Sequence, residues 1–198
     1  MRTLPDTMTS PAVPSREALA AALLADLSSH TKERFGSMVA TGGLYGLALD
    51  MAFDPDPRIA FRISWALEWA YFYDPVAFLP HVPAFLRNFG AVTNASVRRH
   101  YAKILSHLIR SGLYVPTTGE GEAIAAVCFD LLIAPAVRPA VQVWCMEILA
   151  DLADSLPWVR EELPATLRHR FGASPGFDVR ALRILRRLDR WGVRFFLP

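Results

Sequence analysis

Residues 96–108 carry apolar and polar side chains with the periodicity of an amphipathic helix. Its large apolar residues are separated by four, three, one and three positions: Val97, Tyr101, Ile104, Leu105 and Leu108. This spacing places them on one face of a helix, which we expect to be buried. Basic residues follow a neighbouring face. The pattern therefore predicts a helix with one side in the core and one charged edge.

Segments with the same rhythm fill most of the chain, and none shows the alternation of a strand. Ser15 and Thr31 are candidate N-caps, and Asp-Pro steps indicate further helix starts. These signals predict helices over residues 16–24, 32–40, 44–53, 58–73, 75–88, 94–110, 120–134, 138–153, 157–171 and 177–190. Pro80 and Pro83 should kink or break the helix over 75–88, because proline lacks the N–H that a helix interior needs.

Four of these segments recur at a regular interval. Each has Pro-Arg or Val-Arg at the expected start of a helix, and the Arg residues are Arg58, Arg98, Arg138 and Arg180. Their spacings of 40, 40 and 42 residues match the period of HEAT-type and armadillo-type repeats, in which each unit is built on a pair of helices. One pair cannot cover its own apolar face, so stacked pairs would build a continuous core.

The repeat predicts an all-α fold. We expect a right-handed, HEAT- or armadillo-like α-solenoid of about four to five helix pairs, in a single domain over residues 15–190. Asp56 and Asp178, each two residues before its Arg, fit the start of the second helix of such a pair. Residues 1–14 are rich in Pro, Thr and Ser, and we expect a disordered arm. Two roles stay open for residues 191–198: a cap over the core, or an apolar segment for a partner.

Composition agrees with a large helical core. Hydrophobic residues make up 53% of the 198 residues and charged residues 20%, against about 45–50% and about 25% in typical domains. The formal net charge is +2, but residues 158–198 carry a balance of +5. Nineteen of the 21 basic residues are Arg. The C-terminal part is therefore a local basic zone.

The cysteines and the hydropathy of the chain indicate the cellular compartment in which the protein works. Cys128 and Cys145 lie in apolar helical segments, and we expect two buried free thiols. No apolar signal sequence is visible in residues 1–14, and the longest uncharged run, Phe35 to Leu49, is shorter than the about 20 residues of a membrane span. We predict a cytoplasmic protein that does not enter a membrane.

Several segments keep an order and spacing that suggest a known family: RIAFRISWALEW, SVRRHYAKIL, CFDLL, AVQVWCMEILADLA, PWVREEL and GFDVRALRILRRL. Over roughly residues 40–190 the chain resembles a family of small bacterial HEAT-like proteins of uncharacterised function. Pro139 and Pro175 depart from that pattern. Members are sometimes labelled adenylosuccinate lyase, but this chain is short and lacks the Ser-rich flexible-loop signature of that enzyme. A looser resemblance, by fold analogy, links the architecture to HEAT-like DNA alkylation-repair glycosylases.

Basic side chains on the expected second helices form a candidate partner-binding face, which we call the Arg ladder: Arg58, Arg62, Arg98, Arg99, Lys103, Arg138, Arg180, Arg183 and Arg187. In the last helix the ladder continues to Arg190 at spacings of three, four and three residues, which makes one stripe. Along a groove this ladder would form a positive track for an acidic peptide or for phosphates. The alternative is structural, with each Arg bound to acids and helix ends of neighbouring units.

Aromatic residues form a second stripe. Phe61, Trp65, Trp69 and Phe72 follow one another at spacings of four, four and three, and we expect this stripe to pack in the core. A base-flipping enzyme would instead need aromatic faces and a carboxylate in one cleft. The candidates for that arrangement are Trp65, Trp69, Tyr71, Tyr73 and Trp144, with Glu68, Asp130 or Glu147 as the acid.

Catalytic and metal-binding motifs are missing from the sequence. His100 and His107 lie on one helix face without the further ligands that a metal site needs. The glycines at 42, 43 and 46 are not followed by the Lys and Ser or Thr of a phosphate-binding loop. We expect no catalytic residue, no metal and no cofactor, and we favour a binding protein over an enzyme.

The sequence thus predicts a non-enzymatic helical-repeat scaffold that binds a protein or an acidic peptide along the Arg ladder. The alternative is a nucleic-acid-binding protein related to HEAT-like DNA alkylation-repair glycosylases. A scaffold should show basic patches broken by acids, together with an apolar groove. A nucleic-acid-binding protein of this type should show a continuous basic face with an exposed Trp and a carboxylate.

Overall fold

The computed structural model describes residues 14–189, and all the regular elements in that range are helical. The helices are α1 (Arg16–Ala25), α2 (Thr31–Thr41), α3 (Tyr45–Met51), α4 (Pro57–Tyr73), α5 (Pro75–Phe78), the 3-10 helix η1 (Leu79–His81), α6 (Val82–Ala91), α7 (Ala95–Arg110), α8 (Thr118–Ile133), α9 (Pro139–Leu152), α10 (Pro157–His169) and α11 (Pro175–Asp189). The all-α prediction is confirmed. The predictions for residues 1–13, for Arg190 and for the tail 191–198 lie outside the described residues.

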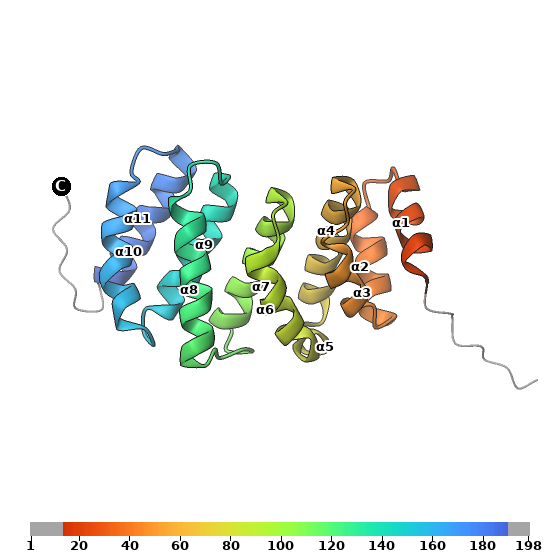
Figure 1. Ribbon diagram of the computed structural model, residues 1–198, viewed down its shortest axis with the longest axis horizontal. Helices are drawn as coiled ribbons and strands as arrows, with labels where there is room; N and C mark the ends of the chain where they lie inside the picture. Colours follow the sequence, from red (N-terminus) through yellow and green to blue (C-terminus); the bar gives the residue numbers. More distant parts are fainter. Residues whose placement is uncertain (1–13, 190–198) are drawn as a thin grey trace, which may run out of the picture.

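The helices succeed one another along the long axis, from α1 at one end to α11 at the other (Figure 1). One row consists of α2, α4, α7, α9 and α11, each packed against the next; we call it the second-helix row. The helices α3, α6, α8 and α10 each pack against the following member of that row; we call them the first-helix row. This arrangement brings side chains about one repeat apart in the chain into contact.

A single hydrophobic core runs between the two rows. The predicted buried face of α7 is confirmed, since Val97, Tyr101, Ile104, Leu105 and Leu108 are all fully buried. Phe85 of α6 stacks on Tyr101, with ring centroids 4.8 Å apart. Stacking of this kind adds to the stabilisation that comes from apolar burial.

The predicted cysteine state is also confirmed, because Cys128 and Cys145 are both buried and free. Burial raises the pKa of the Cys128 thiol, since a thiolate is poorly solvated in an apolar core. Between residues 14 and 189, no helix is long and apolar enough to cross a membrane.

Several predicted helix starts are confirmed by their capping contacts. Ser15 Oγ accepts a hydrogen bond from the N–H of Ala18, and Asn94 Oδ1 accepts from the first turn of α7. We predicted that the next helix begins at Glu120; α8 begins earlier, at Thr118, and Thr117 and Glu120 cap it reciprocally. The predicted break around Pro80 is confirmed as well: the chain leaves α-helical hydrogen bonding over η1, between α5 and α6.

Two predicted helix starts were wrong. Thr31 does not cap α2; it is the first residue of that helix, and its hydroxyl donates to the carbonyl of Ser28. Asp178 and Arg180 do not begin α11, because the helix starts at Pro175, where proline is tolerated in the first turn. The Asp178 carboxylate accepts from the N–H of Gly172 instead. The repeat in sequence is therefore offset from the true helix starts.

The aromatic stripe of α4 is not the core face that the sequence predicted. Phe61, Trp65 and Trp69 are only partly buried, and Phe72 is 39% exposed. The buried face of α4 carries smaller residues such as Ile63, Ala66 and Leu67. Trp69 itself packs directly against α2, where Gly36 makes room for its ring: a Cβ on that glycine would come within 2.6 Å of the indole.

Candidate functional site

The Arg ladder lies on three helices of the second-helix row, α4, α7 and α11, and at the start of a fourth, α9. Two of its members hold the ends of neighbouring helices. Arg62 donates to the carbonyls of Leu23 and Asp26 at the end of α1, the latter at 2.8 Å. Arg98 Nε donates to the carbonyl of Val92, just after α6, at 2.7 Å. Both side chains satisfy carbonyls that a helix end leaves without partners.

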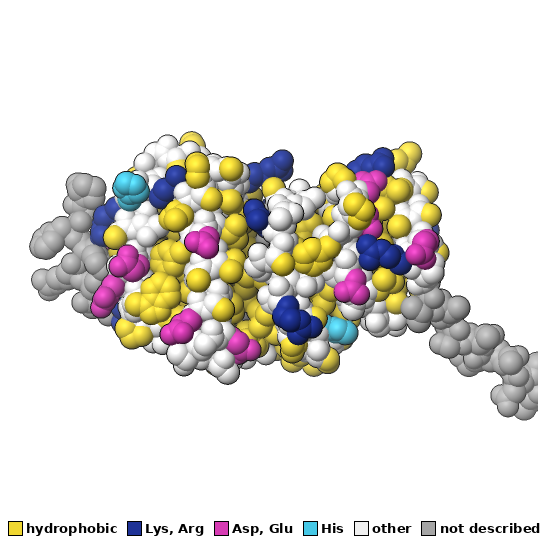
Figure 2. Space-filling view, viewed as in Figure 1, with side chains coloured by type: hydrophobic (Ala, Val, Ile, Leu, Met, Phe, Trp, Pro, Cys, Tyr) yellow, Lys and Arg dark blue, Asp and Glu magenta, His cyan; other side chains and the backbone are white. Residues whose placement is uncertain are grey.

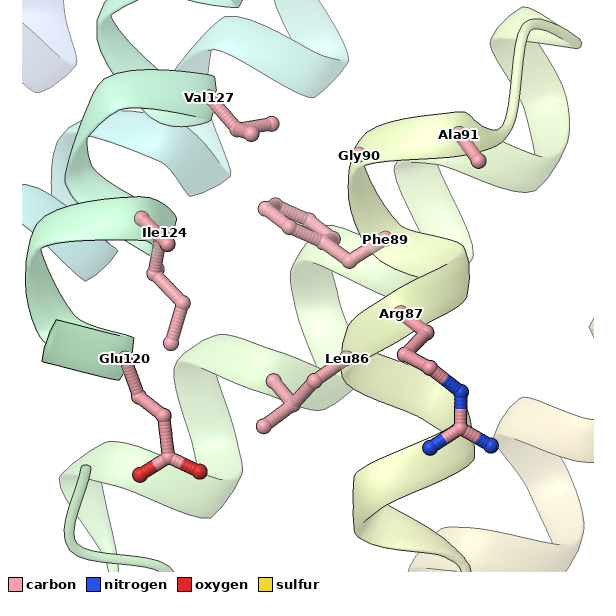
Figure 3. A pocket seen from close by; sticks show the side chains of 9 residues that line it. Leu86, Arg87, Phe89, Gly90, Ala91, Glu120, Ile124 and Val127 are labelled. Carbon is pink, nitrogen blue, oxygen red and sulfur yellow. The ribbon is translucent and has the colours of Figure 1, made fainter. Parts of the chain in front are cut away.

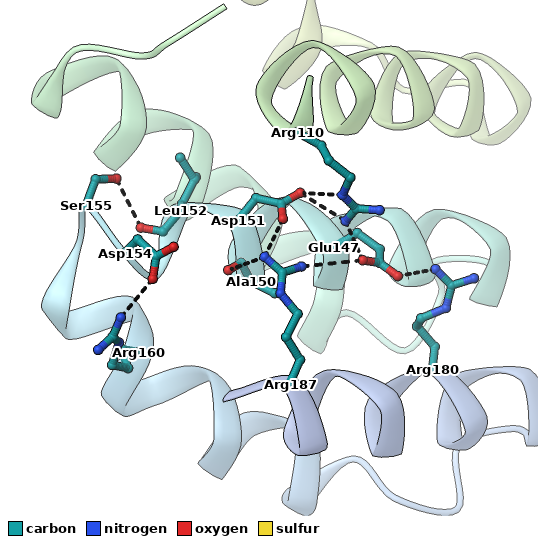
Figure 4. A network of polar contacts seen from close by, with 10 residues as sticks. All are labelled: Arg110, Glu147, Ala150, Asp151, Leu152, Asp154, Ser155, Arg160, Arg180 and Arg187. Carbon is teal, nitrogen blue, oxygen red and sulfur yellow. Dashed lines mark hydrogen bonds and ion pairs between the residues drawn. The ribbon is translucent and has the colours of Figure 1, made fainter. Parts of the chain in front are cut away.

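The C-terminal part of the ladder is tied into an ionic cluster between α7, α9 and α11 (Figure 4). Arg180 and Arg187 of α11 bind Glu147 and Asp151 of α9; the Arg187–Asp151 distance is 2.5 Å. Arg110 of α7 approaches the same two acids from the other side, at 2.5 and 3.0 Å. These Arg residues therefore neutralise buried carboxylates and do not form a free positive track.

Hydrogen bonds from Arg side chains favour the ionised form of the Glu147 carboxylate. Burial raises the pKa of Glu147, but hydrogen bonds from Arg110 and Arg180 outweigh it, so that the pKa lies below its ordinary value. Arg110 is not among the residues predicted for the ladder. A signal was available, because Arg110 precedes Glu147 and Asp151 by 37 and 41 residues, close to the repeat period.

Lys103 belongs to a second buried cluster, between α4 and α7. Its Nζ lies 2.6 Å from Oε1 of Glu68, and Nδ1 of His100 lies 2.5 Å from Oε2 of the same carboxylate. Burial raises the pKa of Glu68, yet the hydrogen bonds from His100 and Lys103 outweigh it and leave the pKa below its ordinary value. Arg99, next along α7, is exposed and donates to Nε2 of His100 at 3.4 Å.

The side chains of two ladder members have no ion pair or hydrogen bond within residues 14–189: Arg138, which precedes α9, and Arg183 of α11. Both are exposed. Arg58 is 71% exposed along its side chain and binds Asp56, the cap of its own helix. That contact, with the N–H of Arg58, lowers the pKa of Asp56 to about 2. The residues free to meet a partner are thus a minority of the ladder.

A groove of about 590 Å³ brings Arg138 together with ladder members of α4. It lies at the starts of α4, α7 and α9 and is lined by Pro57, Arg58, Phe61, Arg62, Asn94, Ala95, Ser96 and Arg138. We call it the basic groove. Three guanidinium groups and one aromatic ring share this space, whereas the acid nearest to them in the chain, Asp56, neutralises only Arg58. The basic groove is therefore the part of the ladder best suited to an anionic side chain.

An apolar groove of about 410 Å³ lies between α6 and α8 (Figure 3). Leu86 and Phe89 project into it from α6, and Ile124 and Val127 face them from α8. It opens between two members of the first-helix row. The molecule therefore carries an apolar groove apart from its basic one.

The structure does not gather the aromatic residues considered for a base-binding cleft around a free carboxylate. Trp69 stacks on Tyr73 at 5.1 Å, Tyr71 is buried, and Trp144 lines a hollow with Phe72 and His107. The acids Glu68 and Glu147 are bound by cations. Asp130 lies elsewhere, on α8.

His107 has a pKa below its ordinary value, because burial disfavours the charged ring and Arg110 adds positive charge nearby. Its Nδ1 lies 2.6 Å from the hydroxyl of Tyr71. The folded state then binds fewer protons than the unfolded state, so this contribution to stability is present above the ordinary His pKa and is lost as pH falls. We expect the urea midpoint of the wild type to drop more between about pH 7 and about pH 5 than that of His107→Gln. Equal drops would contradict this assignment.

Across residues 14–189 no group of three or more His, Cys, Asp or Glu side chains is arranged to hold a metal ion. Comparison of the chain with models of protein families, with curated proteins and with solved structures finds no match. Any functional assignment therefore depends on the chemistry of the grooves themselves.

Proposed function

We propose that this chain is a HEAT-like helical-repeat scaffold, a right-handed α-solenoid of five helix pairs, that binds an acidic peptide or protein segment in the basic groove. The pairs are α1 with α2, α3 with α4, α6 with α7, α8 with α9, and α10 with α11. Support comes from the row of second helices, in which each helix packs on the next. A cytoplasmic setting agrees with two buried cysteines that remain unpaired.

The observation that carries the proposal is the unpaired Arg138 beside Arg58 and Phe61 in the basic groove. A carboxylate entering this space meets a planar guanidinium able to bind it in a bidentate manner. Phe61 offers an apolar surface beside it. An acidic segment with interspersed apolar residues matches both features, whereas an uncharged segment would leave Arg138 without a partner.

The rest of the ladder favours a peptide over nucleic acid. Glu68, Glu147 and Asp151 neutralise Lys103, Arg110, Arg180 and Arg187 along the same row. A nucleic-acid backbone needs a continuous series of free cations, since each phosphate contact adds to affinity. Along this row, acids neutralise most of the basic residues and leave free positive charge only in places. Such a surface suits a short acidic segment that binds at one groove.

The test uses a fluorescent peptide in which Glu alternates with apolar residues, and its anisotropy on titration with the protein. Arg58→Gln/Arg138→Gln should raise the Kd about tenfold or more. The charge-matched control Arg87→Gln/Arg183→Gln replaces two exposed Arg outside the basic groove and should change the Kd by less than about threefold. An equal loss in both variants would contradict the proposal, because it would reflect net charge alone.

A second titration uses labelled duplex DNA from about 50 mM to about 200 mM salt. We expect no micromolar binding. Micromolar binding that weakens steeply with salt would replace the peptide proposal by the nucleic-acid alternative.

A further inference from the structure

A separate hollow lies between α8 and α10, on the first-helix row. Its volume is about 300 Å³, and it is lined by Ala126, Phe129, Asp130, Trp158, Glu162 and Thr166. The rings of Phe129 and Trp158 lie 5.5 Å apart, and Trp158 is 39% exposed. Figure 2 shows this side of the molecule, where acidic side chains surround exposed hydrophobic surface over α8 and α10. The hollow thus combines aromatic walls with negative charge.

Asp130 of α8 and Glu162 of α10 line this hollow from two different helices. Neither carboxylate has an ion pair or a hydrogen bond with any residue in the range 14–189. The two acids of α9 differ in this respect, since Glu147 and Asp151 are neutralised by Arg110, Arg180 and Arg187. A cation that enters the hollow would therefore meet two carboxylates that no other cation holds.

The geometry points to a binding site for an arginine side chain of a basic partner segment. A guanidinium is planar, stacks on an aromatic face and carries five donors that match carboxylates. Stacked on the exposed Trp158, it can donate to Asp130 and Glu162 at once. A lysine ammonium has no planar face to stack, and we expect it to bind more weakly.

A phosphate backbone does not fit this surface. Glu122 and Glu161 are also exposed on α8 and α10, so the region carries negative charge beyond the two acids of the hollow. The site uses none of the residues of the basic groove. A negative result for the hollow would therefore leave the proposed function of the basic groove intact. A negative result for the basic groove would likewise leave the inference about the hollow intact.

The experiment titrates the full-length protein into three labelled peptides with one Gly-Ser framework, which carry Arg, Lys or uncharged citrulline at two positions. We expect the Arg peptide to bind and the citrulline peptide to lose about tenfold or more in affinity. Asp130→Asn/Glu162→Gln should weaken the Arg peptide by about tenfold or more, and Trp158→Ala by about threefold to tenfold.

The matched control is Glu122→Gln/Glu161→Gln, which removes the same net charge from the same two helices outside the hollow. It should change the Kd by less than about threefold. Trp158→Phe keeps an aromatic face and should retain most of the affinity, which separates stacking from any loss of folding in Trp158→Ala. Equal weakening by the two acid variants, equal binding of the Arg and citrulline peptides, or no binding of the Arg peptide would each overturn the inference.

Discussion

Glu147→Gln is expected to lower the free energy of unfolding by about 2 to 3 kcal/mol. The Glu147 side chain is 3% exposed, and three Arg residues from α7 and α11 converge on it and on Asp151. Loss of the charge leaves three guanidinium groups with one carboxylate. Removing one partner of a buried ion pair costs about 3–5 kcal/mol. We reduce that figure because these Arg side chains are 27% to 42% exposed and partly screened.

Urea unfolding followed by circular dichroism measures this effect. Asp154→Asn is the control, because it breaks the exposed Arg160–Asp154 pair and should cost about 0–1 kcal/mol. The pKa of Glu147 lies below its ordinary value, so its contribution is present at neutral pH and is lost as pH falls through the folded-state pKa. The difference between wild type and Glu147→Gln should therefore shrink in acid. A cost like that of Asp154→Asn would contradict the role of the cluster.

Phe85→Ala should lower the free energy of unfolding by about 3 to 5 kcal/mol. Phe85 is fully buried, stacks on Tyr101 and meets Phe78 edge to face at 5.4 Å. Truncation removes these contacts and leaves a cavity between α6 and α7 that helix packing cannot fully close.

The same urea titration measures the effect of Phe85→Ala. Val76→Ala provides the control, because Val76 is 63% exposed and its truncation should change stability by less than about 0.5 kcal/mol. A cost below about 1 kcal/mol for Phe85→Ala would contradict the packing described for α6 and α7.

Local signals predicted most of the helices. Ser15 and Asn94 bond to the first turns that they cap, and Pro80 interrupts the helix that it was expected to break. The failures have a common cause. Thr31 and Arg180 stand where a cap or a helix start is chemically reasonable, but Pro175 opens α11 earlier and competing hydrogen bonds engage Thr31. Local chemistry permits several starts, and tertiary context selects one.

The faces of helices were harder to assign. The stripe of Phe61, Trp65, Trp69 and Phe72 has helical spacing, but spacing does not tell which side a neighbouring helix covers. In the fold, α2 covers Trp69, for which Gly36 makes room, whereas Phe72 stays 39% exposed. No feature of residues 58–73 alone contains this information.

For the candidate site too, the sequence does not show which side chains come into contact, as the Arg ladder illustrates. Its Arg residues could be identified from sequence, but their partners lie about one repeat away in the chain. Only the stacking of the helices shows that Arg180 and Arg187 are neutralised while Arg138 is left without a partner. The hollow of Asp130 and Glu162 likewise exists only because α8 and α10 lie side by side.

The most direct test of the account locates the bound acidic peptide by amide chemical-shift mapping of the labelled protein. The account predicts that the perturbed amides cluster around the basic groove, at residues 58–62, at 94–96 and at Val137 and Arg138. The amides of α11 should change little, because Arg180 and Arg187 are already bound by Glu147 and Asp151. Perturbations centred on α11, with the basic groove unaffected, would contradict the account.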